Sequence, residues 1–397
     1  MRTAAGRLAV RCIVLDDEHV LEPGEIAWDA RGRIVALRRS RRAERDLCLL
    51  PGLVDAHAHL QLAPLPATAP RAFVPWAEAV LGAQRGATAA SCRRRLRQAV
   101  RELLADGATA FGEIDTSGHG AAALAQLPVA GRCYRELTGF HLDRAGSRQL
   151  VRERRAAGRG AVAAGLSPHA PYSVAADLFR AAFATGQPLA IHCAETPAEQ
   201  EFLRRGRGPF RDLLARLGRL PADFVPPGVG AVRWLERLGV LGPRTQLVHC
   251  QELERGDAAR IAAAGASIVV CPGTIAWFGR TPPPVPAWLA AGIPVGLGTD
   301  SRASNDGWSL RGELAQAARL WPGLAPGRLL AMATRFGARA LARPGLGRLR
   351  RGGRADFVAI DAAARPQQAI EAFVHGQRLP RFVVAGGVRV PAARARR

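Results

Sequence analysis

Short apolar runs alternate with helical patterns along most of the chain. Eight runs are continuously apolar, as strands buried on both faces of a parallel sheet are. They cover residues 52–57, 108–114, 129–135, 161–168, 189–193, 246–250, 267–271 and 294–299. Segments with the apolar spacing of amphipathic helices lie between them, at residues 93–105, 175–184, 210–217, 231–238, 254–264 and 309–320. Eight strand–helix units favour a closed barrel over an open sheet, so we predict an α/β fold, a (β/α)8 TIM barrel.

The two ends of the chain follow another pattern. Short strands are predicted at residues 8–15, 25–29 and 34–37, and again at residues 356–360 and 382–390, the last with a hairpin turn at Gly386-Gly387. A small β-sandwich domain built from both termini accounts for these strands. We therefore predict that residues 1–50 and 344–397 form this domain and that residues 51–343 form the barrel.

Histidine or aspartate residues end five of the predicted barrel strands, where catalytic groups of such barrels lie. They are His57 and His59 on strand one, His169 on strand four, His192 on strand five, His249 on strand six and Asp300 on strand eight. A lone histidine in an apolar run is more often a satisfied core residue than a metal ligand. Alternate residues of a strand point to the same side, however, so His57 and His59 can reach one ion. Five strands that end in this way indicate imidazoles and a carboxylate around a single cation, a ligand set that suits zinc.

The charge of the chain changes this interpretation little. The formal net charge is +23, and all 56 basic residues are arginine. The arginine clusters are short and scattered and lack interleaved aromatic residues, so we predict no dedicated nucleic-acid partner. The absence of lysine excludes a Walker A lysine, a Schiff base and a carbamylated lysine that bridges two metal ions.

Cysteine usage and the N-terminus indicate the compartment. Seven cysteines without a CxxC pair argue against a disulfide framework and against a thiolate zinc site. No apolar run is long enough to span a bilayer. Arg7 and Arg11 interrupt the segment where a signal peptide needs an apolar stretch. We therefore expect a cytoplasmic protein without a membrane partner, and a homo-oligomer is compatible with the sequence.

Five short motifs carry a resemblance to a known family. They are PGLVDAHAH (51–59), SPHAPYS (167–173), IHCAE (191–195), VHC (248–250) and GTDS (298–301). In this order and spacing they resemble the amidohydrolase superfamily. More narrowly, they resemble its cytosine-deaminase-like branch, with the guanine, S-adenosylhomocysteine/methylthioadenosine and aminodeoxyfutalosine deaminases and the triazine hydrolases. The resemblance covers nearly the whole chain, including GGRADF at residues 352–357.

The resemblance implies roles for the residues that match these motifs. It implies one divalent metal ion, expected to be Zn²⁺ with Fe²⁺ as an alternative, held by His57, His59, His192 and Asp300. Glu195 matches the proton-shuttling glutamate, His249 the histidine that orients or stabilises the attacking hydroxide, and His169 a substrate-contacting histidine. Such an ion lowers the pKa of its water toward ~7, and Asp300 can accept a proton from that water. The expected catalytic residues are therefore Glu195, His249 and Asp300.

The implied reaction is hydrolysis of a non-peptide C–N bond. A small aminated heterocycle would lose ammonia, with an adenine-type nucleoside such as aminodeoxyfutalosine or S-adenosylhomocysteine as the leading candidate. Trp76, on a large loop after His59, and Trp277 are candidates to stack on the ring, with packing in the buried core as the more common role of such residues.

Two departures from the family pattern, Gln61 and the segment 271–277, fall where substrate is expected. Hydrolytic dechlorination or cyclic amide hydrolysis on the same site therefore stays open, because the metal chemistry is shared. A catalytically silent binding scaffold is the alternative of another class. The intact set of ligand and proton-transfer residues speaks against it.

Overall fold

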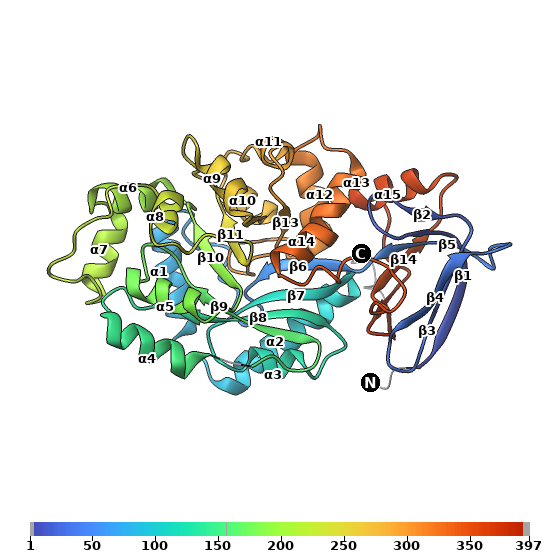
Figure 1. The fold of residues 1–397 in the computed structure, drawn as a ribbon, viewed down its shortest axis with the longest axis horizontal. Coiled ribbons are helices and arrows are strands. Elements are labelled where there is room, and N and C mark those ends of the chain that lie inside the picture. Colours follow the sequence, from blue (N-terminus) through green and yellow to red (C-terminus); the bar gives the residue numbers. More distant parts are fainter. Residues whose placement is uncertain (1–3, 156, 392–397) are drawn as a thin grey trace.

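The computed structural model describes residues 4–155 and 157–391 and contains the predicted barrel (Figure 1). Eight parallel strands follow one another around one sheet in chain order. They are β6 (Leu53–Ala58), β7 (Ala108–Asp115), β8 (Ala130–Leu137), β9 (Val162–Pro168), β10 (Leu189–Cys193), β11 (Thr245–His249), β12 (Ser267–Val270) and β13 (Val295–Leu297). Each predicted strand overlaps one of these, so the (β/α)8 prediction is confirmed.

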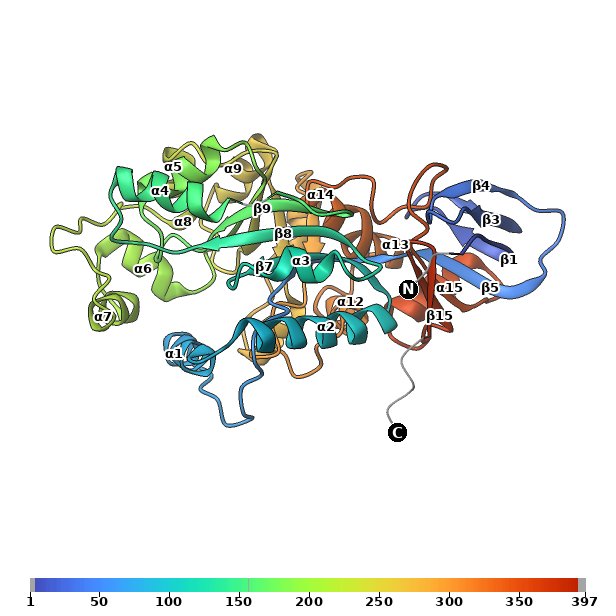
Figure 2. The ribbon, with the colours of Figure 1, turned by 90° about the horizontal axis from the view of Figure 1, so that it is seen from below.

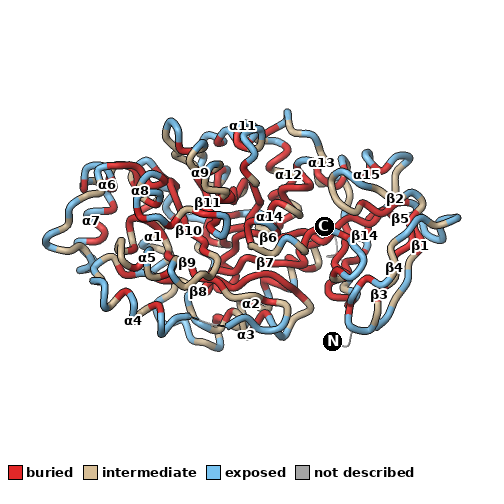
Figure 3. The backbone as a smooth tube through the Cα atoms, viewed as in Figure 1, coloured by how far each residue is buried: buried red, intermediate tan, exposed pale blue. Residues whose placement is uncertain are grey.

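The apolar runs form strands because both of their faces are covered. Every residue of β6, β7, β10 and β11 is buried, and Figure 3 shows the buried zone that runs through the middle of the molecule. Side chains fill the inside of the barrel and helices cover the outside, so neither face of these strands meets water. The sheet closes where Ala58, the last residue of β6, pairs with Asp300 beyond β13.

Helices surround the barrel (Figure 1). Those at predicted positions are α2 (Ala89–Ala105), α5 (Ala176–Ala184), α7 (Pro209–Arg216), α8 (Ala231–Arg237), α9 (Asp257–Ala264) and α12 (Leu310–Leu320). The sequence patterns missed α1 (Phe73–Gln84), α3 (Gly120–Leu124), α4 (Arg144–Arg154), α6 (Pro197–Arg205), α10 (Pro272–Trp277), α11 (Val285–Ala290), α13 (Pro326–Ala331), the π-helical turn Met332–Phe336 and α14 (Gly337–Ala340). Helices α1 and α7 lie side by side at one end of the molecule (Figure 2).

The end segments form a second sheet apart from the barrel strands (Figure 1). Its order is β16-β15-β14-β5-β1-β3-β4, with β2 paired to β1. The strands are β1 (Gly6–Val14), β2 (Val20–Leu21), β3 (Gly24–Trp28), β4 (Ile34–Arg39), β5 (Arg45–Pro51), β14 (Phe357–Asp361), β15 (Phe382–Ala385) and β16 (Val388–Pro391), and α15 (Pro366–Val374) lies between β14 and β15 in the chain. The predicted β unit built from both termini is thus confirmed, while its boundaries at residues 50 and 343 stay predictions.

Strand β5, which the sequence patterns missed, joins the two halves of this sheet. It pairs with β1 on one side and with β14 on the other. The sheet curls, so that Trp28 packs edge-on against Phe357 with ring centroids 5.5 Å apart. Gly52 alone separates β5 from β6, so the second sheet leads directly into the strand that carries His57.

Within the described ranges, no helix combines the length and the apolar character that crossing a membrane requires.

Candidate metal centre and active site

The barrel brings five of the predicted residues together at one end. His57 lies on β6 with His59 just after it, His192 lies on β10, His249 ends β11, and Asp300 follows β13. His57 Nε2 and His59 Nε2 each lie 3.6 Å from Asp300 Oδ1, and His59 Nε2 lies 3.3 Å from His192 Nε2. Two ligand atoms bound to one tetrahedral zinc ion are about 3.4 Å apart. The spacing therefore suits a single small cation.

His57 tests whether a cation fits this cluster. Its side chain is fully buried, and neither ring nitrogen has a hydrogen-bond partner among the described residues. A buried polar atom without a partner is costly and needs an explanation. The ligand atoms of His57, His59 and His192 lie within 4.8 Å of one another, so an ion between them would give one of the two His57 nitrogens a partner. The residues present therefore fit a divalent ion.

The protonation of the histidines favours metal binding. Burial lowers the pKa of His59 to about 3 and holds the pKa of His192 well below its usual value, so both rings are neutral near pH 7. His192 Nδ1 lies 2.9 Å from the His169 carbonyl, and a carbonyl only accepts, so this nitrogen carries the proton. The Nε2 lone pair of His192 is thereby left free for a ligand bond.

The Asp300 carboxylate is held so that only one oxygen faces the histidines. Its Oδ2 accepts hydrogen bonds from the Thr274 and Ser304 hydroxyls, both at 2.9 Å. Its Oδ1 faces His57 and His59. Burial alone would favour the neutral acid, but the imidazoles of His57, His59 and His249 around it favour the ionised form and hold the pKa of Asp300 well below its usual value. The group is therefore a carboxylate with one oxygen available.

The backbone at this end of the barrel is strained. Five non-glycine residues of the described part have φ in the left-handed region, and four of them follow or end barrel strands at the site: Ala194, His249, Cys250 and Asp300. The φ of His249 is 73° and that of Asp300 is 55°. Such residues cost about 1–3 kcal/mol each and persist only where the surroundings impose them. The surrounding contacts therefore maintain the orientation of both side chains.

Glu195 lies beside the cluster, two residues beyond β10. Its Oε1 accepts a hydrogen bond from Arg280 Nη1 at 3.3 Å, and its Oε2 lies 3.7 Å from His249 Nε2. Its backbone N–H donates to Glu199 Oε2 at 2.8 Å. Burial raises the pKa of Glu195 to about 7, although the Arg280 charge opposes that rise. A carboxyl group with this pKa can both accept and donate a proton near neutrality.

A cavity of about 500 Å³ opens from the cluster, a size typical of small-molecule sites. Its inner end is lined by His59, His169, His192, Glu195, His249 and Asp300. Its outer walls come from α1 and α7 and are largely apolar, with Phe73, Trp76, Phe210, Leu213 and Leu214. The prediction that Trp76 lies on a large loop is partly wrong, because residues Phe73–Gln84 form helix α1.

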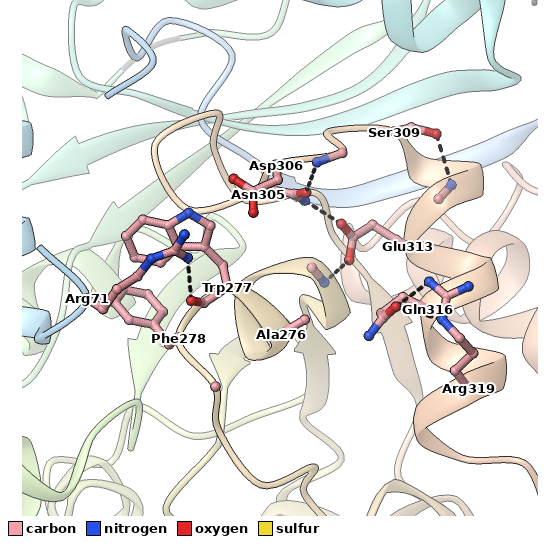
Figure 4. Close-up of a pocket in the computed structure, with 14 residues that line it drawn as sticks. Arg71, Ala276, Trp277, Phe278, Asn305, Asp306, Ser309, Glu313, Gln316 and Arg319 are labelled. Atoms are coloured by element: carbon pink, nitrogen blue, oxygen red, sulfur yellow. Dashed lines mark hydrogen bonds between the residues drawn. The ribbon is translucent and has the colours of Figure 1, made fainter. Parts of the chain in front are cut away.

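His169 and the two tryptophans occupy different places. His169 Nδ1 lies 2.7 Å from the Ser173 hydroxyl, and the ring lines the cavity. Trp76 also lines it, and its Nε1 donates to the Ala303 carbonyl at 2.8 Å. Trp277 instead lines a neighbouring hollow of about 680 Å³, where the Arg71 guanidinium lies 4.0 Å from its ring centroid (Figure 4). The structure thus does not bring Trp277 to the cavity that holds the histidines.

Gln61 does not line that cavity either. Its buried side chain donates through Nε2 to Glu113 Oε1 at 2.7 Å and to Asp115 Oδ1 at 2.9 Å. The other Glu113 oxygen accepts the Leu60 backbone N–H at 2.8 Å. This departure from the family pattern therefore fixes the turn that follows His59.

Sequence reasoning missed the side chains that orient the two carboxylates. Thr274 lies in the segment noted only for its departure from the family pattern, and Ser304 lies just beyond the GTDS motif. Arg280 is 85 positions from Glu195 in the chain, so no local pattern links them. The Ser or Thr side chains could have been suspected near a buried aspartate; Arg280 could not.

Comparison with known proteins agrees with this fold. The profile of the amidohydrolase family matches residues 48–390. The aminodeoxyfutalosine deaminase of Deinococcus radiodurans is 36% identical over 247 residues, which is 55% of this chain and 56% of that protein. The 5-methylthioadenosine/S-adenosylhomocysteine deaminase of Nitratidesulfovibrio vulgaris is 30% identical over 349 residues, 81% of this chain and 73% of that protein.

Solved structures share the fold. The aminofutalosine deaminase of Helicobacter pylori in complex with methylthio-coformycin superposes with a TM-score of 0.80 at 22% identity, covering 97% of this chain and 99% of that one. The atrazine chlorohydrolase of Arthrobacter aurescens complexed with zinc has a TM-score of 0.79 at 22% identity, covering 97% and 94%. The family match spans most of the chain and includes all the site residues described above. The chain therefore belongs to the amidohydrolase family.

Proposed function

We propose that this chain is a mononuclear metal-dependent aminohydrolase that removes the amino group of an adenine-type heterocycle. One observation carries the proposal. A cluster of imidazoles and one carboxylate oxygen, spaced for a single ion, lies beside a second carboxylate at the inner end of a cavity of small-molecule size. The deaminase names of the relatives, of which the first is matched over little more than half its length, support the same reaction.

His57, His59, His192 and Asp300 hold the ion in this proposal. Imidazole nitrogens and one carboxylate oxygen favour Zn²⁺, with Fe²⁺ as the alternative. When bound, such an ion lowers the pKa of a water molecule so that it can act as a nucleophile near neutral pH. The chain contributes the orientation of that water and the movement of its protons.

Glu195 and His249 are the catalytic residues closest to the ligands. Arg280 holds Glu195 Oε1, so Oε2 is the oxygen free to take a proton from water and pass it to a ring nitrogen. His249 Nε2, 3.7 Å from that oxygen, stabilises the developing tetrahedral centre by a hydrogen bond. The Asp300 carboxylate accepts the second proton and delivers it to the departing amine. The balance is Ar–NH2 plus H2O giving Ar=O, in its ring N–H form, plus NH3.

The cavity fits a ribose-bearing substrate in the same proposal. His169 lines its inner part. The Ser173 hydroxyl donates its hydrogen to the Ala170 carbonyl at 3.2 Å, so the same hydroxyl accepts from His169 Nδ1. The His169 Nε2 lone pair is then an acceptor for a sugar hydroxyl or a ring N–H. Trp76 provides an aromatic face in the wall. Trp277, whose ring centroid is 6.3 Å from that of Trp76, supports Trp76 from outside the cavity.

An ammonia-release screen tests the proposal. Zinc-loaded and metal-stripped protein would be incubated with adenine nucleosides, aminotriazines, chlorotriazines and cyclic amides. The proposal expects metal-dependent ammonia release from adenine nucleosides. Chloride release from chlorotriazines or ring opening of cyclic amides, without ammonia release from any adenine nucleoside, would reject it in favour of the other hydrolyses.

A further inference from the structure

The two hydroxyls that hold Asp300 come from different parts of the chain. Thr274 lies on α10, after β12, and Ser304 lies in the segment after β13. Their oxygens are 3.3 Å apart, so both act on the same carboxylate oxygen. If either segment moved, Asp300 would rotate and Oδ1 would leave its place opposite His57. Something must therefore fix the two segments relative to each other.

Glu313 on α12 joins these segments. Its Oε2 accepts the backbone N–H of Gly273, the residue before Thr274, at 2.6 Å. Its Oε1 accepts a hydrogen bond from Asn305 Nδ2, on the residue after Ser304. Figure 4 shows both bonds meeting at the Glu313 carboxylate. One side chain thus holds the immediate neighbour of each hydroxyl.

Glu313, Gly273 and Asn305 form a set of three residues that we call the Glu313 bracket. Asn305 Nδ2 also donates to the carbonyl of Thr299, the residue before Asp300, at 3.3 Å. Asn305 Oδ1 accepts the Gly307 N–H at 3.1 Å, which fixes the orientation of the amide. A Cβ atom on Gly273 would overlap Glu313 Oε1 and Asn305 Nδ2. Glycine at position 273 is therefore explained by the close approach of these two side chains.

The burial of Glu313 argues against a role in packing alone. The residue is 2% exposed, and the two donors that it accepts from are a backbone N–H and an amide, both neutral. Burial raises its pKa to about 8, although the hydrogen bonds from Gly273 and Asn305 favour the ionised form and oppose that rise. An apolar residue would fill the same space at lower cost. The benefit of a carboxylate here is that its two hydrogen bonds hold Gly273 and Asn305 in fixed positions.

We propose that Glu313 is a positioning residue for the metal centre: through Gly273 and Asn305 it sets Thr274 and Ser304, which in turn present Asp300 Oδ1 to the metal ion. The inference rests on the metal site of the proposed function. It adds a residue that contacts neither substrate nor ion and lies in the wall of the hollow lined by Trp277.

Glu313→Gln tests the proposal, because the amide keeps the shape of the side chain but turns one acceptor oxygen into a donor. Partners of metal ligands typically contribute 10- to 100-fold to metal affinity or activity. We expect Zn²⁺ affinity, measured by competition with a chelator, to fall about 10- to 100-fold in a variant that stays folded. The visible absorption of the Co²⁺-loaded protein should change, because it reports ligand geometry. The kcat of the variant should fall by a larger factor than its KM changes.

Two further variants make the test specific. Gln316→Ala, one turn along α12 in the wall of the same hollow, removes a side chain that accepts from Arg319 and should leave metal affinity and the Co²⁺ spectrum unchanged. In the double variant Glu313→Gln with Asn305→Asp, the side chain at position 313 donates the shared hydrogen bond and the side chain at position 305 accepts it. This double variant should recover part of the metal affinity that Glu313→Gln loses.

The outcomes separate this inference from the proposed function. Wild-type affinity and Co²⁺ spectrum in folded Glu313→Gln would overturn it, whatever the substrate proves to be. If Glu313→Gln does not fold, Gly273→Ala tests the same bracket and should shift the Co²⁺ spectrum in the same way. Failure of both to fold would assign the bracket to stability and overturn the positioning role. A wild-type chain that binds metal but deaminates nothing would reject only the proposed function.

Discussion

The His59 backbone N–H donates a hydrogen bond to the Asp300 carbonyl at 2.6 Å. In return, the Asp300 N–H donates to the His57 carbonyl at 3.1 Å. These bonds join the first and last barrel strands, so the residues that close the barrel are the same ones whose side chains form the cation cluster. Barrel closure and metal binding are therefore expected to stabilise each other.

The first prediction follows from this coupling. Removing the metal with a chelator should lower the midpoint of thermal unfolding by at least about 5 °C, because an ion that binds only the folded chain stabilises it. Adding back Zn²⁺ should restore the midpoint. Elemental analysis should find one tightly bound ion per chain. Two tightly bound ions, or a midpoint that does not respond to metal, would be inconsistent with a mononuclear centre at the closure.

The second prediction concerns Glu195. Glu195→Gln should keep the bound ion but lower kcat about 10²- to 10⁴-fold, because the amide cannot move a proton. Glu78→Gln is a suitable control, since Glu78 lies on α1 and pairs with Arg216 at 2.6 Å on the surface. Metal content and kcat measured on both variants decide the role. Loss of the ion from Glu195→Gln would show that Glu195 is a ligand.

The third prediction concerns pH and Arg280. Burial raises the pKa of Glu195 to about 7 and Arg280 opposes this, so kcat/KM should fall as the pH drops through that region and protonates the carboxylate. Arg280→Met removes the opposing charge and raises the pKa further. The acid limb of the kcat/KM profile should therefore move to higher pH, while Arg280→Lys should keep it near its original place. An acid limb that is identical in all three proteins would show that Glu195 does not control it.

Most of the fold could be predicted because the barrel strands are buried on both faces and read as apolar runs. The cluster of histidines and aspartate at one end of the barrel could be predicted because five of those runs end in histidine or aspartate. Helix α1 was missed because its apolar residues line a cavity and pack against α7, so they do not form one clean stripe. The Arg280–Glu195 pair and the Glu313 bracket depend on contacts between segments far apart in the chain, which no local pattern contains.

The fourth prediction separates the two tryptophans. Trp76 lines the cavity and donates to the Ala303 carbonyl, so Trp76→Phe should raise KM about tenfold through lost contact area and a lost hydrogen bond. Trp277 lies outside the cavity against Arg71, so Trp277→Phe should change KM by no more than about twofold. The comparison uses the same substrate and metal loading for both. An increase in KM that is larger for Trp277→Phe than for Trp76→Phe would place the substrate in the hollow of Figure 4.

A stoichiometric assay on zinc-loaded protein tests whether the chain deaminates an adenine-type substrate. Aminodeoxyfutalosine, S-adenosylhomocysteine and 5-methylthioadenosine would each be incubated with the enzyme while the loss of adenine absorbance and the release of ammonia are followed together. We predict that at least one of them yields one ammonia per adenine ring consumed, that chelation of the metal stops the reaction, and that Glu195→Gln is inactive. Absence of ammonia from all three, under conditions where the protein holds its metal ion and is folded, would contradict this prediction.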